Sequence, residues 1–239
     1  MRTRMAHRNP RSVGRGAACA GILVAAAFGL SLPGCVTAGI ALRESLGIPK
    51  RLQLADRVKE ARDSQDDAKV QFESALTEFL GITQLGAAAG KSPKQAELES
   101  RYKSLNGQYE RSVSKAKQVT DRIEAVETVG DKLFVEWNAE LDQYTDPKLR
   151  SLSESQMNDA RNRYDELLRV MRNAESKMPP VLDQLRNQVL FLKHNLNASA
   201  IAGLGEIALD VQNDVASLIA EMETAIREAN AFIETLAGA

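Results

Sequence analysis

Cysteine, aromatic residues and an excess of charge of either sign are all scarce in this chain. Only two cysteines occur among 239 residues, which excludes a disulfide-rich scaffold. Aromatic residues make up 5%, and only seven prolines and 15 glycines occur, so disorder, collagen-like repeats and all-β sandwiches are disfavoured. The formal net charge of -1 gives no reason to expect nucleic acid as a partner. These absences favour a helical protein.

Residues 1–34 have the composition of a secretory signal peptide. Five arginines precede an apolar run from Ala17 to Leu32, and the segment contains no acidic residue. The run is about 16 residues long and contains two glycines, whereas a membrane-spanning helix needs roughly 20 apolar residues. We therefore expect a signal peptide over 1–34 rather than a transmembrane anchor.

The sequence Leu32-Pro33-Gly34-Cys35 resembles a bacterial lipobox, with an aliphatic residue three before the cysteine and a small one directly before it. The resemblance implies cleavage between Gly34 and Cys35, and a lipid on the thiol of Cys35. Cys19 would leave with the signal, so no free thiol would remain. Two or three acyl chains hold a protein on a membrane essentially permanently. Because Val36 replaces the aspartate of inner-membrane lipoproteins, the resemblance implies the periplasmic face of the outer membrane. The alternative is an ordinary signal peptide with a chance cysteine.

After a tether over 35–49, apolar residues recur at alternating spacings of four and three, which is typical of coiled-coil helices. The pattern predicts one helix over about 50–80 and another of about 50 residues, which at 1.5 Å per residue is about 75 Å long. A helix of that length does not fit inside a compact globule. The apolar seams of these two helices contain Leu54, Val58, Ala61, Gln65, Ala68, Phe72, Ala75 and Phe79, then Leu98, Tyr102, Leu105, Tyr109, Ser112, Ala116, Val119, Ile123, Val126, Gly130, Leu133 and Trp137.

A third helix is predicted over 157–178 and a fourth over 182–236. Pro179-Pro180 separates them, and the chain either reverses there or continues through a kink. The spacing changes between Ala200 and Ile207, which predicts a bend or a local break of the helix near Gly203. Breaker residues predict loops over 81–94 and 144–149. We therefore expect residues 50–239 to form an all-α, elongated antiparallel bundle, or coiled-coil hairpins, of about four long helices.

None of the candidate motifs predicts catalysis, a cofactor or a metal. The run from Gly86 to Ser92 has three residues between its glycines, where a phosphate-binding loop needs four, and we expect a flexible loop. The carboxylates of Asp63, Asp66 and Asp67 lie on one predicted helix, without the turn that brings ligands together around calcium. A solvated charged face is the expected structure there.

His194 is the single histidine after the signal segment, and it stands beside Lys193, Asn195 and Asn197. One histidine without cysteine cannot form a typical zinc site, and no nucleophile motif accompanies it. This polar group is instead a possible partner surface, or a place for a buried hydrogen bond near the predicted bend.

Four blocks of the sequence are similar to the DUF2959 family of uncharacterised, mostly Gram-negative envelope proteins. They are the blocks 47–51, 54–65, 136–144 and 188–197, the last reading Gln-Val-Leu-Phe-Leu-Lys-His-Asn-Leu-Asn. The resemblance implies a helical, coiled-coil-rich lipoprotein, and it brings no assigned reaction, cofactor or partner.

Two classes of function agree with these features. The favoured one is a lipid-anchored periplasmic protein that acts, without catalysis, as a helical interaction or structural module of the cell envelope. It would contact the membrane through the lipid on Cys35 and would bind an envelope protein or a second copy of itself. The alternative is an envelope ligand-binding or stress-sensing protein. An enzyme acting on envelope material is less favoured, because thin helical bundles offer few pockets where catalytic groups converge.

Overall fold

A computed structural model describes residues 49–87 and 94–237, and every regular element in this part of the chain is an α-helix. The elements are α2 (Lys50–Ala87), α3 (Gln95–Leu141), α4 (Pro147–His194), the short α5 (Ala198–Ala202) and α6 (Gly205–Ala237). The predicted all-α class is therefore confirmed. The predicted signal peptide and lipid tether over 1–48 lie outside the described residues.

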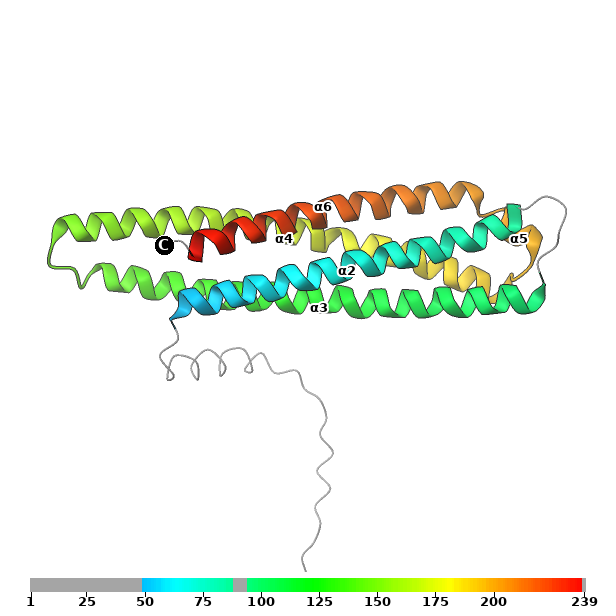
Figure 1. The fold of residues 1–239 in the computed structure, drawn as a ribbon, viewed down its shortest axis with the longest axis horizontal. Helices are drawn as coiled ribbons and strands as arrows, with labels where there is room; N and C mark the ends of the chain where they lie inside the picture. Colours follow the sequence, from blue (N-terminus) through cyan, green and yellow to red (C-terminus); the bar gives the residue numbers. More distant parts are fainter. Residues whose placement is uncertain (1–48, 88–93, 238–239) are drawn as a thin grey trace, which may run out of the picture. The chain divides into compact units, whose positions relative to one another are not determined.

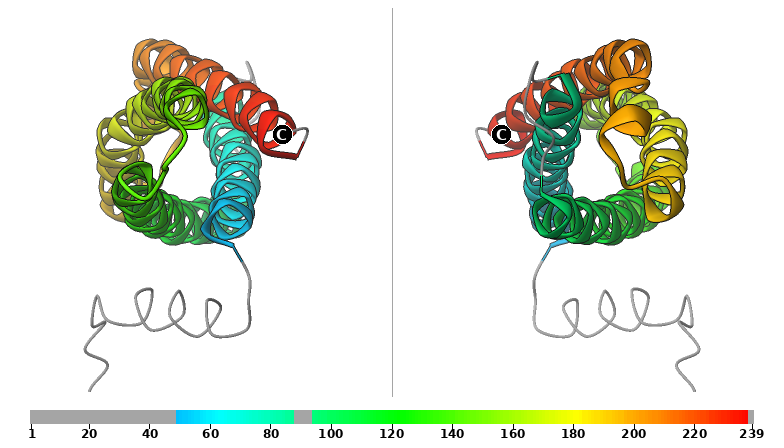
Figure 2. Two further views of the ribbon diagram at one scale, coloured as in Figure 1. Left: turned by 90° about the vertical axis from the view of Figure 1, so that its left-hand side faces the viewer. Right: turned by 90° about the vertical axis from the view of Figure 1, so that its right-hand side faces the viewer.

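The four long helices form an antiparallel bundle in which each helix packs against two neighbours. Helix α2 contacts α3 and α6, and α4 contacts the same two helices from the opposite side (Figure 1 and Figure 2). At 1.5 Å per residue, α3 and α4 are each about 70 Å long. Their connection projects beyond the first turn of α2 and the last turn of α6 (Figure 1). The expected elongated bundle of four long helices is confirmed.

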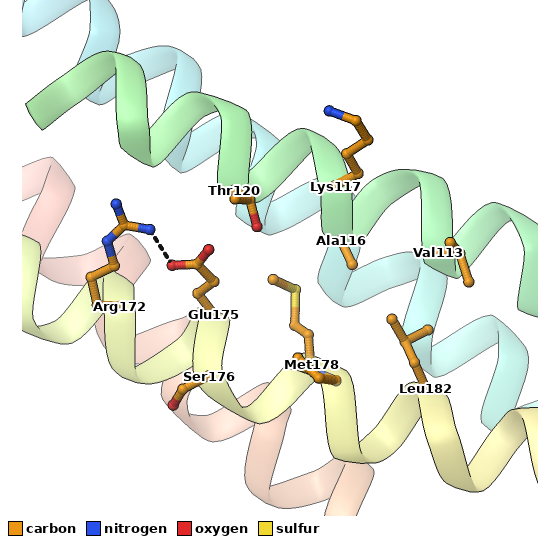
Figure 3. Close-up of a pocket in the computed structure, with 10 residues that line it drawn as sticks. Val113, Ala116, Lys117, Thr120, Arg172, Glu175, Ser176, Met178 and Leu182 are labelled. Carbon is orange, nitrogen blue, oxygen red and sulfur yellow. Dashed lines mark hydrogen bonds and ion pairs between the residues drawn. The ribbon is translucent and has the colours of Figure 1, made fainter. Parts of the chain in front are cut away.

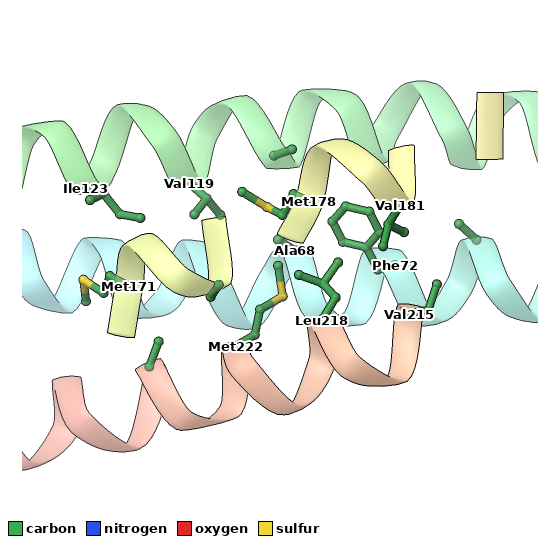
Figure 4. Packing of buried hydrophobic residues seen from close by; sticks show 14 of the residues in the cluster. Ala68, Phe72, Val119, Ile123, Met171, Met178, Val181, Val215, Leu218 and Met222 are labelled. Carbon is green, nitrogen blue, oxygen red and sulfur yellow. The ribbon is translucent and has the colours of Figure 1, made fainter. Parts of the chain in front are cut away.

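The core is a continuous apolar column made from the heptad seams. All eight predicted seam residues of α2 are fully buried. Figure 4 shows one part of this column, where Phe72 of α2, Val119 of α3 and Met178 of α4 gather with residues of α6. Burial of apolar surface stabilises by about 25 cal/mol per Å², so the seams supply most of the driving force for folding.

The proline pair does not end a helix. Helix α4 runs through Pro179 and Pro180, so the structure selects continuation rather than reversal at this point. Both prolines are exposed, whereas Met178 on one side and Val181 on the other are buried at 2% exposure each. Because the seam is intact on both sides, core packing holds the helix together where two backbone donors are missing.

The chain reverses between His194 and Gly205, where the change of spacing predicted a bend or a local break. Its proposed seam through Ala200 and Ile207 was wrong. The buried residues are Ile201, Leu204, Ala208 and Val211, spaced three, four and three, while Ile207 is 40% exposed. The seam of α6 is therefore regular back through α5, and the change of phase lies in the turn itself.

The first helix is longer than predicted at its end. Helix α2 continues through Gly81 to Ala87, because Ile82 and Thr83 extend its buried face by another turn. The loop predicted over 81–94 is correspondingly shorter, and residues 88–93 lie outside the described part. In the next turn, the side chain of Asp146 accepts a hydrogen bond from the Lys148 amide at 2.8 Å. This N-cap and Pro147 at the first position begin α4 inside the loop predicted over 144–149, ten residues before the predicted start of the third helix at 157.

Gly130, which interrupts the apolar seam of α3, lets Tyr164 of α4 approach closely. A β-carbon at this glycine would lie 2.3 Å from the tyrosine ring. Tyr164 is 1% exposed, and its ring packs against Phe134 at a centroid distance of 5.3 Å. Burial raises the pKa of the Tyr164 hydroxyl. The ring of Tyr164 therefore occupies the space that a side chain at position 130 would fill.

Candidate functional site

The structure contains an apolar groove between α3 and α4 with a volume of about 560 Å³. Figure 3 shows Met178 and Leu182 of α4 pointing toward α3, where Ala116 and Val113 lie opposite. Val113 is 41% exposed, so the groove is open to solvent. The sequence analysis did not predict this groove.

The proline pair leaves two backbone carbonyls beside this groove without their usual helical N–H donors. Proline has no N–H, so Pro179 and Pro180 cannot donate the usual helical hydrogen bonds to the carbonyls of Glu175 and Ser176. Both of these residues line the groove, as does Pro179. A proline pair beside a buried methionine was the sequence signal that could have indicated a groove at this point.

A charged cluster closes one end of the groove. Arg172 donates to Glu127 of α3 through Nε at 3.0 Å and to Glu175 through Nη1 at 2.6 Å. The hydrogen bond to Glu127 raises the pKa of Arg172, and the bond to Glu175 adds to it. Lys117 points away from the groove in Figure 3 and pairs with Asp121 at 2.8 Å. The groove therefore offers apolar contacts to a ligand, and the charge of Arg172 at its end is already compensated by Glu127 and Glu175.

A second feature lies at the end of the bundle where α4 meets α6. Gln184 donates a hydrogen bond to Asp214, and this antiparallel register places the start of α6 beside the last turns of α4. Exposed apolar side chains occur on both helices near this end, in the same stretch as two exposed residues of the predicted partner surface. We call this group the distal surface: Leu190, Phe191, Lys193, His194, Ile207 and Leu209.

The two asparagines of the predicted partner surface cap helices. The Asn195 side chain donates to the Phe191 carbonyl at 3.0 Å. The Asn197 side chain accepts from the Ala200 amide at 3.0 Å and is the N-cap of α5. The predicted polar contact near the bend is thus a pair of local caps, whereas the Lys193 and His194 side chains are exposed. The partner role of this group stays a prediction.

The other sequence candidates occupy separate sites. Asp63 pairs with Arg62, Asp66 with Lys69 and Asp67 with Lys115, as a solvated charged face predicts. In residues 49–87 and 94–237, no three His, Cys, Asp or Glu side chains come together in a group that could hold a metal. Gly34 and Cys35, the predicted cleavage and lipidation site, precede the described residues, and the Gly86–Ser92 segment lies largely outside them.

None of the helices in the described part of the chain is long and apolar enough to cross a membrane. No curated protein matches the sequence. One protein-family model matches residues 40–236, and the family is described as "Protein of unknown function (DUF2959)". The match includes α2 to α5 and nearly all of α6. Since this match covers more than half of the 239 residues, the chain belongs to the DUF2959 family.

Proposed function

We propose that this protein is a lipid-anchored periplasmic lipoprotein whose bundle is a non-enzymatic interaction module of the cell envelope. The distal surface carries the proposal. Phe191 is 39% exposed and Leu209 is 63% exposed, and a protein partner would remove both from water. Aromatic side chains of this kind are enriched in protein interfaces.

The position of the distal surface suits a tethered protein. Helix α2 begins at the opposite end of the bundle (Figure 1), so the chain that leads from a lipidated Cys35 would join the bundle there. The 38 residues of α2 would then place the distal surface about 57 Å from the point where the chain enters the bundle, at 1.5 Å per residue. A bundle of this kind would act as a spacer that holds a binding surface away from its membrane.

The test is photo-crosslinking in living cells, with a photoreactive amino acid in place of Phe191. We expect crosslinks to an envelope protein or to a second copy of this chain. Leu209→Glu should abolish them, because it places a charge in the buried part of the contact. The matched control is Val70→Glu, which changes another exposed apolar residue, at 53% exposure, on α2. Crosslinks that survive L209E, or none at all, would count against the module.

Mass spectrometry of protein extracted from membranes tests the anchor separately. We expect the mature chain to begin at Cys35 with acyl groups attached. A mature end elsewhere, or an unmodified Cys35, would refute the lipoprotein part of the proposal.

The groove between α3 and α4 favours a second function, the binding of an apolar ligand. Its volume of about 560 Å³ lies within the range typical of small-molecule sites. An apolar fluorescent probe should bind the wild type and lose affinity in Ala116→Glu, which places a charge among Val113, Met178 and Leu182. Equal binding by both proteins would exclude this groove as the site.

A further inference from the structure

The connection between α3 and α4 forms a tip with exposed apolar side chains. Tyr144 lies in the turn and is 43% exposed, while Leu149 and Leu152 lie on the first turns of α4 at 52% and 57%. The two leucines are three residues apart and therefore share one face of the helix. We call these three residues the hairpin tip.

The hairpin tip is uncovered because its neighbouring helix ends first. Leu149, Leu152 and Gln156 follow one another along a single face of α4. At Gln156 this face borders a recess that Leu236 and Thr235 of α6 also line, and α6 ends at Ala237. Within residues 49–87 and 94–237, the apolar face of α4 thus continues past the last turn of α6.

The hairpin tip lies at the end of the bundle where the chain enters. Lys50, the first residue of α2, pairs with Glu136 near the end of α3 at 2.6 Å. Fifteen residues separate Lys50 from Cys35, so even a fully extended tether spans at most about 50 Å. The attachment point of a lipid on Cys35 is therefore within about 50 Å of this end, while the distal surface lies at the other end of the bundle (Figure 1).

The charges around the hairpin tip are compatible with a lipid surface. Asp142 pairs with Arg150 at 3.0 Å and the Asp146 carboxylate caps α4, so both acidic groups of the turn itself have partners, while Glu140 and Glu154 are exposed on the flanking helix turns. Lys148 and Arg150 have long side chains that can keep their charge in water while their carbon chains lie against apolar groups. Tyrosine favours the boundary between headgroups and hydrocarbon, because one end of its side chain is apolar and the other is polar.

We infer that the hairpin tip inserts into the interfacial region of the bilayer that holds the lipid anchor. This inference rests on the proposed lipidation of Cys35. The acyl chains supply the affinity, and the hairpin tip supplies a second point of contact. Two contacts orient the bundle, whereas a single point of attachment leaves it free to rotate. An upright bundle would present the distal surface at a constant height above the membrane.

The experiment uses the full lipidated protein in vesicles of phosphatidylethanolamine and phosphatidylglycerol. Thr145→Cys places a polarity-sensitive fluorophore in the turn, and Ser199→Cys places it in α5 at the opposite end. Cys35 is blocked by its lipid, so each variant has one reactive thiol. We expect a blue shift of the emission, and quenching by nitroxide-labelled lipid, for T145C and neither effect for S199C.

A matched pair of variants assigns the effect to the leucines. Leu149→Gln with Leu152→Gln should abolish the shift at T145C while the protein stays on the vesicles with an unchanged circular dichroism spectrum. Leu209→Gln, at 63% exposure on the distal surface, should leave the shift intact. Equal quenching at both label positions, or a shift that survives the double variant, overturns the inference.

Two further outcomes separate this inference from the proposed function. Lipidated protein that binds vesicles without a shift at T145C overturns the inference and leaves the anchor standing. A shift that appears without vesicles and grows with protein concentration identifies a second copy of this chain as the occupant, and also overturns the inference. An unmodified Cys35 in the mass spectrum overturns both.

Discussion

Pro179-Pro180 and the segment from Asn195 to Leu204 are two places where a helix was expected to be interrupted, and only the second one reverses the chain. Two missing N–H donors do not end α4, because the seam residues Met178 and Val181 stay in phase across the prolines. Around Asn195 no proline occurs, yet the apolar phase changes and side-chain caps satisfy the free backbone groups. A helix end is thus decided by where the next apolar residue can be buried, more than by the loss of one or two hydrogen bonds.

Removing the packing at the proline pair should have the largest effect. Met178→Ala deletes a buried side chain and should lower the free energy of unfolding by about 2–5 kcal/mol. Urea unfolding followed by circular dichroism measures it. Leu182→Ala, which changes a half-buried residue of the same groove, should cost less. If M178A costs no more than L182A, packing does not hold the helix across the prolines.

A glycine in the seam extends the comparison to a third irregular position. Gly130→Ala places a methyl group on the ring of Tyr164, and overpacking of this kind should cost about 1–3 kcal/mol. Gly107→Ala is the control, since its β-carbon would meet only the flexible end of Arg111 at 3.4 Å, and it should stabilise the helix slightly. Thermal unfolding of both variants separates steric cost from helix propensity, and a stabilised G130A would contradict the close approach.

Removing a proline should sharpen the comparison in the opposite direction. Pro179→Ala restores a donor for the Glu175 carbonyl, which should raise the free energy of unfolding by about 1–2 kcal/mol, because the gain in hydrogen bonding exceeds the greater entropy of the unfolded chain. Pro147→Ala is the matched control. This proline occupies the first helical position, where no donor is missed, so its replacement should not stabilise. A destabilised P179A would mean that the proline itself shapes the packing.

The smallest effect is expected at the reversal. Asn197→Ala removes the side-chain acceptor for the Ala200 amide and should cost about 1 kcal/mol. Asn158→Ala, at an exposed position in the middle of α4, serves as the control and should change stability little. Thermal denaturation of the two variants measures the difference. If N197A is as stable as N158A, the Asn197 cap does not stabilise the start of α5.

The seam residues show which parts of the fold could be predicted from the sequence. All eight predicted positions of α2 are buried, because a repeat of seven residues describes one face of one helix and needs no other information. The seam predicted for α6 was wrong at Ile207. Through the turn the apolar residues fit two alternative heptad assignments, and packing against the neighbouring helices selects the one that buries Ile201 and Ala208. The groove was missed for the same reason, since it is formed by two helices whose register the sequence does not specify.

Residues close together, or a pattern along the whole chain, were enough to predict the all-α class, the seam of α2 and the family of this chain. Contacts between helices were needed for the rest: continuation through Pro179-Pro180, reversal after His194, and the contact of Tyr164 with Gly130. The physical reason is that these features depend on which helices are neighbours. The neighbours are selected by the apolar surface that the four long helices bury together, and no single helix sequence specifies that arrangement.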